Sequence, residues 1–206
     1  MIRTANPQDS AHIHPSYVTS LTFLSPVSVL CLLQIIFYED RNFQGRSYET
    51  SSDCPDELHS YISRCNSIRV EGGFWVVYER PNYRGFQYVL SPGEYPDHQY
   101  WLGFSDAVRS CRVIRHVGAS WRMKVWEKPN FEGESQELAE NMPTFQERWQ
   151  NRPVHSCKVL EGAWVFYDQP NYRGRQYLLE RGEYRRHSEW GGMQPSVGSI
   201  RRVKNP

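Results

Sequence analysis

From residue 35 onward, hydrophobic and polar positions alternate in short runs that are rich in β-branched and aromatic residues. Glycine, proline, asparagine or aspartate bounds each run, a pattern typical of half-buried β-strands joined by turns. No stretch keeps a helical period over three turns, although 143–150 is compatible with a short helix. The pattern predicts an all-β sandwich or barrel. In the first half of this region the predicted strands are 35–39, 46–50, 67–71, 75–78, 86–90 and 109–114, and their counterparts recur in the second half.

Four segments repeat one arrangement: an aromatic residue, an acid, an asparagine, a second aromatic and a glycine at fixed offsets. The glycine follows the first aromatic by seven positions in every case, and a serine in a strand-like run comes later. A unit of about 40 residues can supply the four strands of a Greek key, so each repeat is predicted to form one. The first aromatics are Tyr38, Tyr78, Trp126 and Tyr167; the glycines are Gly45, Gly85, Gly133 and Gly174; the serines are Ser67, Ser110, Ser156 and Ser199.

The spacing of the four glycines predicts two domains. Successive intervals are 40, 48 and 41 residues, so extra residues between repeats two and three mark a linker at 116–120. Repeats two and four also share tryptophans that the other two lack: Trp75 matches Trp164, and Trp101 matches Trp190. Two homologous domains, each made of two sheets packed face to face, follow from this duplication. Their predicted bounds are 35–115, with motifs 35–73 and 74–115, and 121–203, with motifs 121–161 and 162–203.

The repeated positions have physical explanations. Each glycine falls where a hairpin folds back, and it is predicted to adopt a positive φ that other residues adopt at a cost. The first aromatic ring is expected to lie over that glycine. Each late serine is expected to hydrogen-bond the backbone of the folded hairpin, which would otherwise be left unpaired.

Residues 1–34 differ from the rest. Residues 1–20 are polar and without pattern, and 21–33 form an apolar run that Pro26 interrupts. The run is too short to cross a bilayer, and it resembles a signal-peptide core without a typical cleavage site. Its residue types are also those encoded by a pyrimidine-rich intron end. We hypothesise that 1–34 is an atypical leader, translated from a retained intron or an alternative start and joined to a domain that begins near Ile35; a genuine disordered tail and a signal sequence are the alternatives.

Composition narrows the function classes. Hydrophobic residues make up 39% and aromatic residues 14%, enough to exclude general disorder. A formal net charge of +1 argues against a dedicated binder of nucleic acid or anionic membranes. Of the 24 basic residues, 4 are lysine and 20 are arginine. The five cysteines form no CxxC pair and are interpreted as buried, inert thiols in a reducing compartment; they are Cys31, Cys54, Cys65, Cys111 and Cys157.

No catalytic or cofactor motif is evident. The sequence contains no Walker A, GxSxG, HExxH or GxGxxG pattern. His155 and Cys157 lie two positions apart, but without an orienting Asn or Asp they are interpreted as packed core residues rather than a nucleophile and base. The sequence therefore predicts a protein that is not an enzyme and has no cofactor.

The repeated aromatic-Glu-x-x-Asn-aromatic-x-Gly pattern with its delayed serine resembles the βγ-crystallin Greek-key motif. The resemblance covers 35–203, and segments such as FYEDRNFQG, YERPNYRG and PNYRGRQYLL are similar to vertebrate gamma-crystallins. The segment SCKVLEG is similar to the gamma-S branch. The short tail and compact linker resemble the monomeric gamma branch more than the oligomeric beta branch.

The resemblance implies a structural constituent of the eye lens, packed at high concentration in the cytoplasm of lens fibre cells for refraction and transparency. It also implies a monomer with weak, short-range contacts to other crystallins and with no nucleic-acid or membrane partner. The same resemblance makes four tryptophans the buried core indoles, namely Trp75, Trp101, Trp164 and Trp190.

The alternative is a non-lens βγ-crystallin module that binds calcium or responds to stress. Calcium-binding members of the family that this chain resembles share a six-residue pattern, which we call the sextet: two Asn or Asp, two free positions, Ser or Thr, and then Ser. The pattern supplies oxygen ligands. The sextets here, 62–67, 105–110, 151–156 and 194–199, each lack part of that pattern. Arg109 and His155 occupy the penultimate position in two of them, so no metal site is predicted.

Overall fold

The computed structural model describes residues 33–205. Most of the hypothesis for residues 1–34 therefore lies outside the described residues, although Gln34 already belongs to the first strand. No helix of the described range is long and apolar enough to cross a membrane. The first half contains β1 (Gln34–Tyr38), β2 (Ser47–Thr50), α1 (Leu58–Tyr61), β3 (Ser67–Gly72), β4 (Phe74–Arg80), β5 (Arg84–Leu90), β6 (Gly93–Tyr95) and β7 (Ser110–Ile114).

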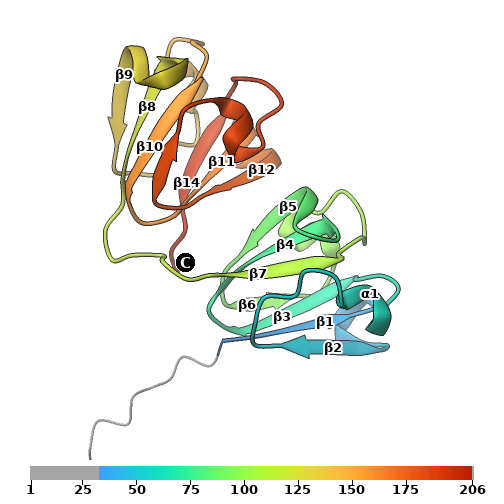
Figure 1. The fold of residues 1–206 in the computed structure, drawn as a ribbon. Helices are drawn as coiled ribbons and strands as arrows, with labels where there is room; N and C mark the ends of the chain where they lie inside the picture. The colour runs from blue at the N-terminus through green and yellow to red at the C-terminus, as the bar shows by residue number, and fades with distance from the viewer. Residues whose placement is uncertain (1–32, 206) are drawn as a thin grey trace, which may run out of the picture. The chain divides into compact units, whose positions relative to one another are not determined.

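The second half repeats this order of elements (Figure 1). It contains β8 (Arg122–Lys128), β9 (Glu132–Leu138), α2 (Phe145–Arg148), β10 (Ser156–Glu161), β11 (Trp164–Gln169), β12 (Arg173–Leu179), β13 (Gly182–Tyr184) and β14 (Ser199–Arg202). Short 3-10 turns at Arg41–Phe43, His98–Trp101, Pro129–Phe131 and His187–Trp190 complete the pattern.

The two motifs of the first domain exchange strands between sheets. The first sheet has the order β2-β1-β3-β6, so β6 of the second motif pairs with β3 of the first. In return, Cys54 of the first motif forms an isolated antiparallel bridge with Cys111 in β7. Each sheet is therefore completed by the other motif, and neither motif has a full sheet alone.

The second domain is built in the same way. Its first sheet has the order β13-β10-β8-β9, with β13 contributed by the later motif. The return contact is the isolated bridge between Met142 and Ile200 in β14. Met142 and Ile200 thus occupy the positions that Cys54 and Cys111 hold in the first domain.

Each domain encloses its own apolar core between its two sheets. In β1, Ile35 and Phe37 face the core while their neighbours are only half-buried, as the alternating sequence predicts. Trp75 and Trp164 are fully buried, and each indole N–H donates to a backbone oxygen, of Gly72 at 3.0 Å and of Glu161 at 3.1 Å. Trp101 and Trp190 are also buried, each in the core of its own domain.

A third apolar cluster joins the domains. Residues of β4 and β7 pack with residues of β11 and β12, among them Val76, Ile114, Val165 and Leu178. Beside this cluster β5 and β12 pair through Gln87 and Gln176, which makes a six-stranded sheet of order β14-β11-β12-β5-β4-β7. The linker therefore connects two domains that share a sheet and an apolar contact.

The sequence predicted most of these elements. The six strands predicted in the first half are present with bounds shifted by one or a few residues. The three-residue strands β6 and β13 were not predicted, because each begins at a glycine and is too short to show an alternating pattern. The helix α2 lies inside the predicted 143–150, whereas the single turn of α1 was not predicted.

We predict that Gly85→Val destabilises the first domain by at least ~1–3 kcal/mol, the usual cost of a side chain forced into sparsely populated backbone space. Gly85 has a φ of +81°, and a Cβ there would lie 2.7 Å from Oε2 of Glu79. Chemical denaturation measures the change. Arg84→Val is the matched control, since Arg84 is an exposed neighbour in the same strand. An unchanged denaturation midpoint for Gly85→Val would contradict the prediction that a side chain is strained at this position.

Candidate functional site

The repeated chemistry of this chain forms four folded hairpins, each closed by one buried serine. In the second motif, Oγ of Ser110 accepts a hydrogen bond from the backbone N–H of Tyr83 at 3.1 Å and donates one to the backbone oxygen of Arg80 at 2.6 Å. Ser110 is fully buried. The hydroxyl thus satisfies two backbone groups of the hairpin that the adjacent sheet does not pair.

The other three motifs repeat this arrangement, with a backbone N–H donor at 2.9–3.0 Å and a backbone oxygen acceptor at 2.6–2.7 Å. All four serines have an exposed fraction of 0%. A hydroxyl with one donor and two lone pairs fits this double role, which alanine cannot fill. The three further sets are Ser67 with Phe43 and Asp40, Ser156 with Phe131 and Lys128, and Ser199 with Tyr172 and Gln169.

The first aromatic ring of each hairpin packs against the second aromatic ring, five residues later. The ring centroids lie 5.3–5.8 Å apart in tilted or edge-to-face geometry, for Tyr38–Phe43, Tyr78–Tyr83, Trp126–Phe131 and Tyr167–Tyr172. A Cβ added at Gly45 would meet Asp40, and one added at Gly133 would meet Lys128 and Glu127. Ring-to-ring packing is therefore the aromatic contribution to closing the hairpin.

The sequence reasoning missed the backbone of the Asn-aromatic pair. Besides the glycine, both residues have positive φ in all four hairpins; for example, Asn82 has φ 57° and Tyr83 φ 60°. A bulky aromatic in this region is strained, while asparagine tolerates it. The asparagine N–H also donates to the neighbouring motif, as from Asn82 to the oxygen of Pro55 at 2.6 Å. The asparagine that recurs at the same offset in all four repeats is the sequence signal from which this conformation could have been predicted.

Cations lie over the second aromatic ring of three hairpins. The guanidinium of Arg69 is 4.1 Å from the ring centre of Phe43, and the ammonium of Lys158 is 4.2 Å from that of Phe131. Arg201 is 5.7 Å from the ring centre of Tyr172. Cation–π attraction covers the exposed side of these rings while keeping charge at the surface.

Glu39 is the acid of the first hairpin, and it joins that hairpin to the loop before β3. Its two carboxylate oxygens accept hydrogen bonds from Arg46 at 3.0 and 2.8 Å. Oε1 also accepts bonds from the N–H and the hydroxyl of Ser63, at 2.8 and 3.0 Å. The hydrogen bonds from Arg46, followed by those from Ser63, lower the pKa of Glu39 to about 2.

The two domains are joined by a reciprocal pair of glutamine side chains. Oε1 of Gln176 accepts from the N–H of Val89 at 3.0 Å, and Oε1 of Gln87 accepts from the N–H of Leu178 at 2.9 Å. An ion pair between Arg112 and Glu180, at 2.7 Å, lies between the same domains. These polar contacts satisfy strand backbone groups next to the third apolar cluster.

The residues of the calcium-type sextets bond to one another. Nδ2 of Asn66 lies 3.3 Å from Oδ2 of Asp106, and the guanidinium of Arg109 donates to the backbone oxygen of Ser63 at 2.7 Å. Within residues 33–205 no group of three or more His, Cys, Asp or Glu side chains converges on one point. In the first domain, the Asp106 carboxylate and the Ser63 backbone oxygen thus accept hydrogen bonds from amide and guanidinium donors.

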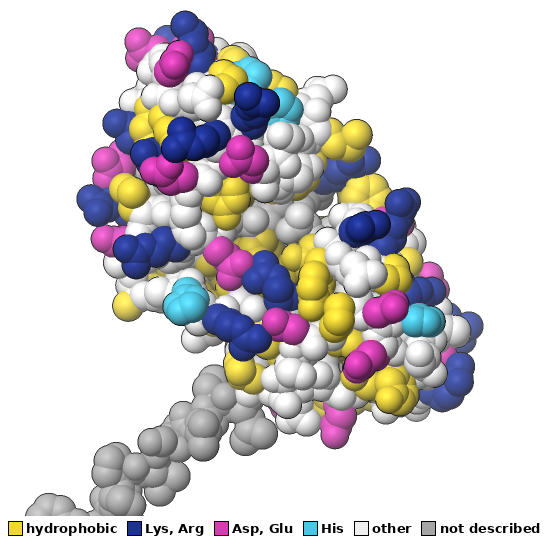
Figure 2. Space-filling model, in the orientation of Figure 1, with side chains coloured by type: hydrophobic (Ala, Val, Ile, Leu, Met, Phe, Trp, Pro, Cys, Tyr) yellow, Lys and Arg dark blue, Asp and Glu magenta, His cyan; other side chains and the backbone are white. Residues whose placement is uncertain are grey.

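Charged side chains of both signs are interspersed over the face seen in Figure 2. Ion pairs between arginine and acidic residues occur throughout, such as Arg41 with Asp97 at 2.9 Å and Arg64 with Asp40 at 2.6 Å. A surface that mixes both signs stays hydrated without a strong field of one sign.

Two Greek-key β-sandwich domains with four serine-closed hairpins define a class of protein, and the comparisons assign its family. The family model described as beta/gamma crystallin matches residues 34–114 and 122–203. The chain belongs to the beta/gamma crystallin family.

Individual relatives are similar over almost their whole length. Gamma-crystallin S-1 of Chiloscyllium indicum is 58% identical over 170 residues, which cover 82% of this chain and 98% of the relative. Gamma-crystallin B of Bos taurus is 55% identical over 170 residues, covering 82% and 97%. Among solved structures, a beta gamma crystallin from Ciona intestinalis is 33% identical, with a TM-score of 0.37, covering 39% of this chain and 98% of that one.

We predict that Glu39 contributes stability that is lost in acid. Because its folded pKa of about 2 lies below the ordinary 4.5, the contribution is complete above about pH 4.5 and disappears as the pH falls toward 2. Glu39→Gln should therefore lower the denaturation midpoint at neutral pH and flatten its decline between pH 4.5 and 2. Arg46→Met, which removes the main partner, should act in the same direction. Equal pH dependence in wild type and Glu39→Gln would refute the assignment.

Proposed function

We propose that this protein is a structural constituent of the eye lens, a stable protein packed at high concentration for refraction and transparency. The observation that carries the proposal is the 55–58% identity to gamma-crystallins over almost the full length of those relatives. The segment 156–162 and the similarity to Gamma-crystallin S-1 support a gamma-S-like member.

The physical properties of the chain suit this role. Its 20 arginines and its aromatic residues are polarizable, planar groups that raise refractive index, and arginine can stack on rings or pair with acids. Lens proteins are scarcely replaced, so slow unfolding matters. Two cores, a shared sheet and four closed hairpins support that requirement.

We further propose that the protein is a cytoplasmic monomer of lens fibre cells, makes weak contacts with other crystallins and has no catalytic role. In its domains, 35–115 and 121–203, the buried polar contacts close a hairpin within its own motif, as at Ser110, or join the two domains, as at Gln176. Cys157, which lies two positions after His155, is fully buried in β10, and burial raises the pKa of its thiol well above the ordinary value. A protonated, enclosed thiol supports a packing role.

Intact-mass analysis of the water-soluble extract of the source animal's lens tests the lens role. We expect an abundant species whose tryptic peptides cover 35–203. The same extraction from liver and muscle serves as the control and should contain little of it. Absence from the lens together with abundance elsewhere would overturn the proposal and favour the non-lens alternative.

Calcium titration separates the two alternatives directly. We expect no heat of binding at micromolar calcium, because Asn66, Asp106 and Arg109 already bond to one another or to backbone oxygen. Binding in the millimolar range, typical of poor ligand sets, would remain compatible with the lens role. A micromolar dissociation constant measured by calorimetry would favour the calcium-binding module.

A further inference from the structure

A small cavity lies where the two domains meet, beside the end of β14. Its volume is about 130 Å³, comparable to the roughly 150 Å³ of a cavity that holds one benzene molecule. Both domains line it: Phe74, Ser91, Tyr100 and Leu102 come from the first domain, and Arg201 comes from the second. None of the described residues that line the cavity is an aspartate or a glutamate. The described lining is therefore largely aromatic and apolar, and its charge is positive.

The internal duplication of the chain provides a comparison for Arg201. Residues 89 positions apart occupy equivalent places in the two domains, since the elements recur in the same order. Arg201 in β14 is equivalent to Arg112 in β7, and Glu180 is the counterpart of the serine in the cavity. Nη1 of Arg112 lies 2.7 Å from Oε2 of Glu180. On that side of the domain contact, the arginine is thus neutralised by a carboxylate of the other domain.

Arg201 lacks a corresponding partner. The position equivalent to Glu180 is held by Ser91, whose hydroxyl carries no charge. Within residues 33–205 no aspartate or glutamate forms an ion pair with Arg201. Its guanidinium lies 5.7 Å from the ring centre of Tyr172, a contact with the ring face that does not use up its N–H donors. An arginine that lines an aromatic cavity without a carboxylate beside it is suited to bind one from outside the chain.

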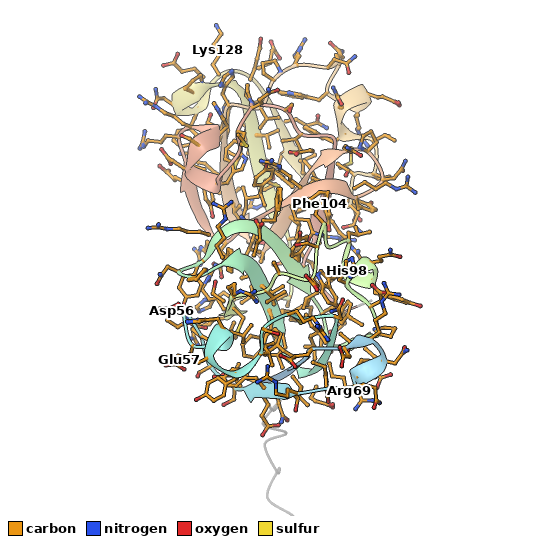
Figure 3. The ribbon with its side chains drawn as sticks, turned by 90° about the vertical axis from the view of Figure 1, so that its right-hand side faces the viewer. Asp56, Glu57, Arg69, His98, Phe104 and Lys128 are labelled. Carbon is orange, nitrogen blue, oxygen red and sulfur yellow. The ribbon has the colours of Figure 1, made fainter. Side chains whose placement is uncertain are left out.

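Two exposed side chains form part of the first-domain wall of the cavity. Tyr100 and Leu102 have exposed fractions of 67% and 46%. The segment that carries them can be followed in Figure 3 between the labelled residues His98 and Phe104. Aromatic and apolar side chains that remain exposed in a cavity between domains are typical of small-molecule sites.

Backbone strain accompanies this exposure. Leu102 has a φ of 61°, in the left-handed region that is costly for a residue with a branched side chain. Its equivalent in the second domain is Gly191, which adopts a φ of 86° at little cost. Tyr100 likewise corresponds to a charged residue, Glu189. The first domain therefore keeps a strained, exposed leucine at a position where glycine satisfies the fold, and strain of this kind is found at functional sites.

We propose that this cavity binds a small molecule that carries both an aromatic ring and a carboxylate group. The carboxylate takes the place beside Arg201 that the carboxylate of Glu180 has beside Arg112. It accepts hydrogen bonds from the guanidinium and from the hydroxyl of Ser91, while the exposed Lys204, which also lines the cavity, adds positive charge.

The aromatic ring of the ligand packs against Phe74, Tyr100 and Leu102. A neutral ring compound gains this packing but leaves the arginine without a partner. An inorganic anion gains the charge contact but leaves the aromatic wall exposed. The lining thus selects for the two groups together, since each satisfies a different part of the cavity.

Titration of the full-length protein with phenylacetate, followed by NMR of the backbone amides, tests the proposal. We expect saturable shifts at Leu102, Gln176 and Val203, which line the cavity, with a dissociation constant of about 1 mM or below. Phenylacetamide, which has the same ring and no charge, should bind at least ~10-fold more weakly, because it loses the charged hydrogen bond. Acetate should cause no saturable shift there. Equal binding of phenylacetate and phenylacetamide, equal shifts with acetate, or no saturable shift at these amides would overturn the proposal.

Variants locate the carboxylate. Arg201→Met should weaken phenylacetate binding by at least ~10-fold. Ser91→Glu places a carboxylate where the second domain has Glu180, so it should pair with Arg201 and abolish binding. Arg173→Met is the matched control, because Arg173 is an exposed arginine of β12 that does not line the cavity; it should bind as the wild type does. Dispersed amide spectra and thermal melts show that each variant is folded. Wild-type affinity in a folded Arg201→Met or Ser91→Glu variant would contradict the proposed site.

Discussion

The rest of the structure depends on the pair of hydrogen bonds that each buried serine makes to its folded hairpin. In every motif the chain turns back with an asparagine, an aromatic and a glycine at positive φ, which is costly for the aromatic residue. The hydroxyl of Ser110, and of its three counterparts, accepts from the N–H of that aromatic and donates to the backbone oxygen of the residue three positions before it. The edge-to-face rings add apolar contact over the same turn. These contacts hold the strained hairpin in one conformation, and the strands of each sheet extend from it.

Strand exchange makes the motifs interdependent. Because β6 completes the sheet of the first motif and Cys54 pairs with β7 of the second, neither motif can bury its apolar face alone. The same exchange in the second domain explains why the two halves have equivalent cores built around Trp75 and Trp164. The third apolar cluster and the pair of Gln87 and Gln176 link the domains in the same way, because they lie at a six-stranded sheet that runs through both domains. The stability of the fold therefore depends on strands that each motif, and each domain, contributes to the sheet of its neighbour.

Much of the fold was predictable because its chemistry is local. The interval of seven residues from aromatic to glycine, and the later serine, lie within single motifs, so the repeat count and the all-β class follow from spacing. The strands β6 and β13 were missed because three residues carry no period. The packing of the first ring against the second was not predicted, because the positive φ of Asn82 and Tyr83 cannot be read from residue types alone. The sextets showed incomplete ligand sets, but not that Asn66 and Arg109 bond to neighbouring oxygens.

The sequence by itself determined the four motifs, their pairing into two domains and the serine positions, because hairpin chemistry acts between residues close in the chain. The tertiary structure decided which distant groups meet. Cys54 and Cys111 are 57 positions apart, and nothing in their spacing distinguishes them from Cys65 or Cys157. They face each other because a loop of one motif crosses to the sheet of the other, where antiparallel pairing places partners on a common face. Gln87 and Gln176 likewise meet because the domains share a sheet, a contact that local sequence does not encode.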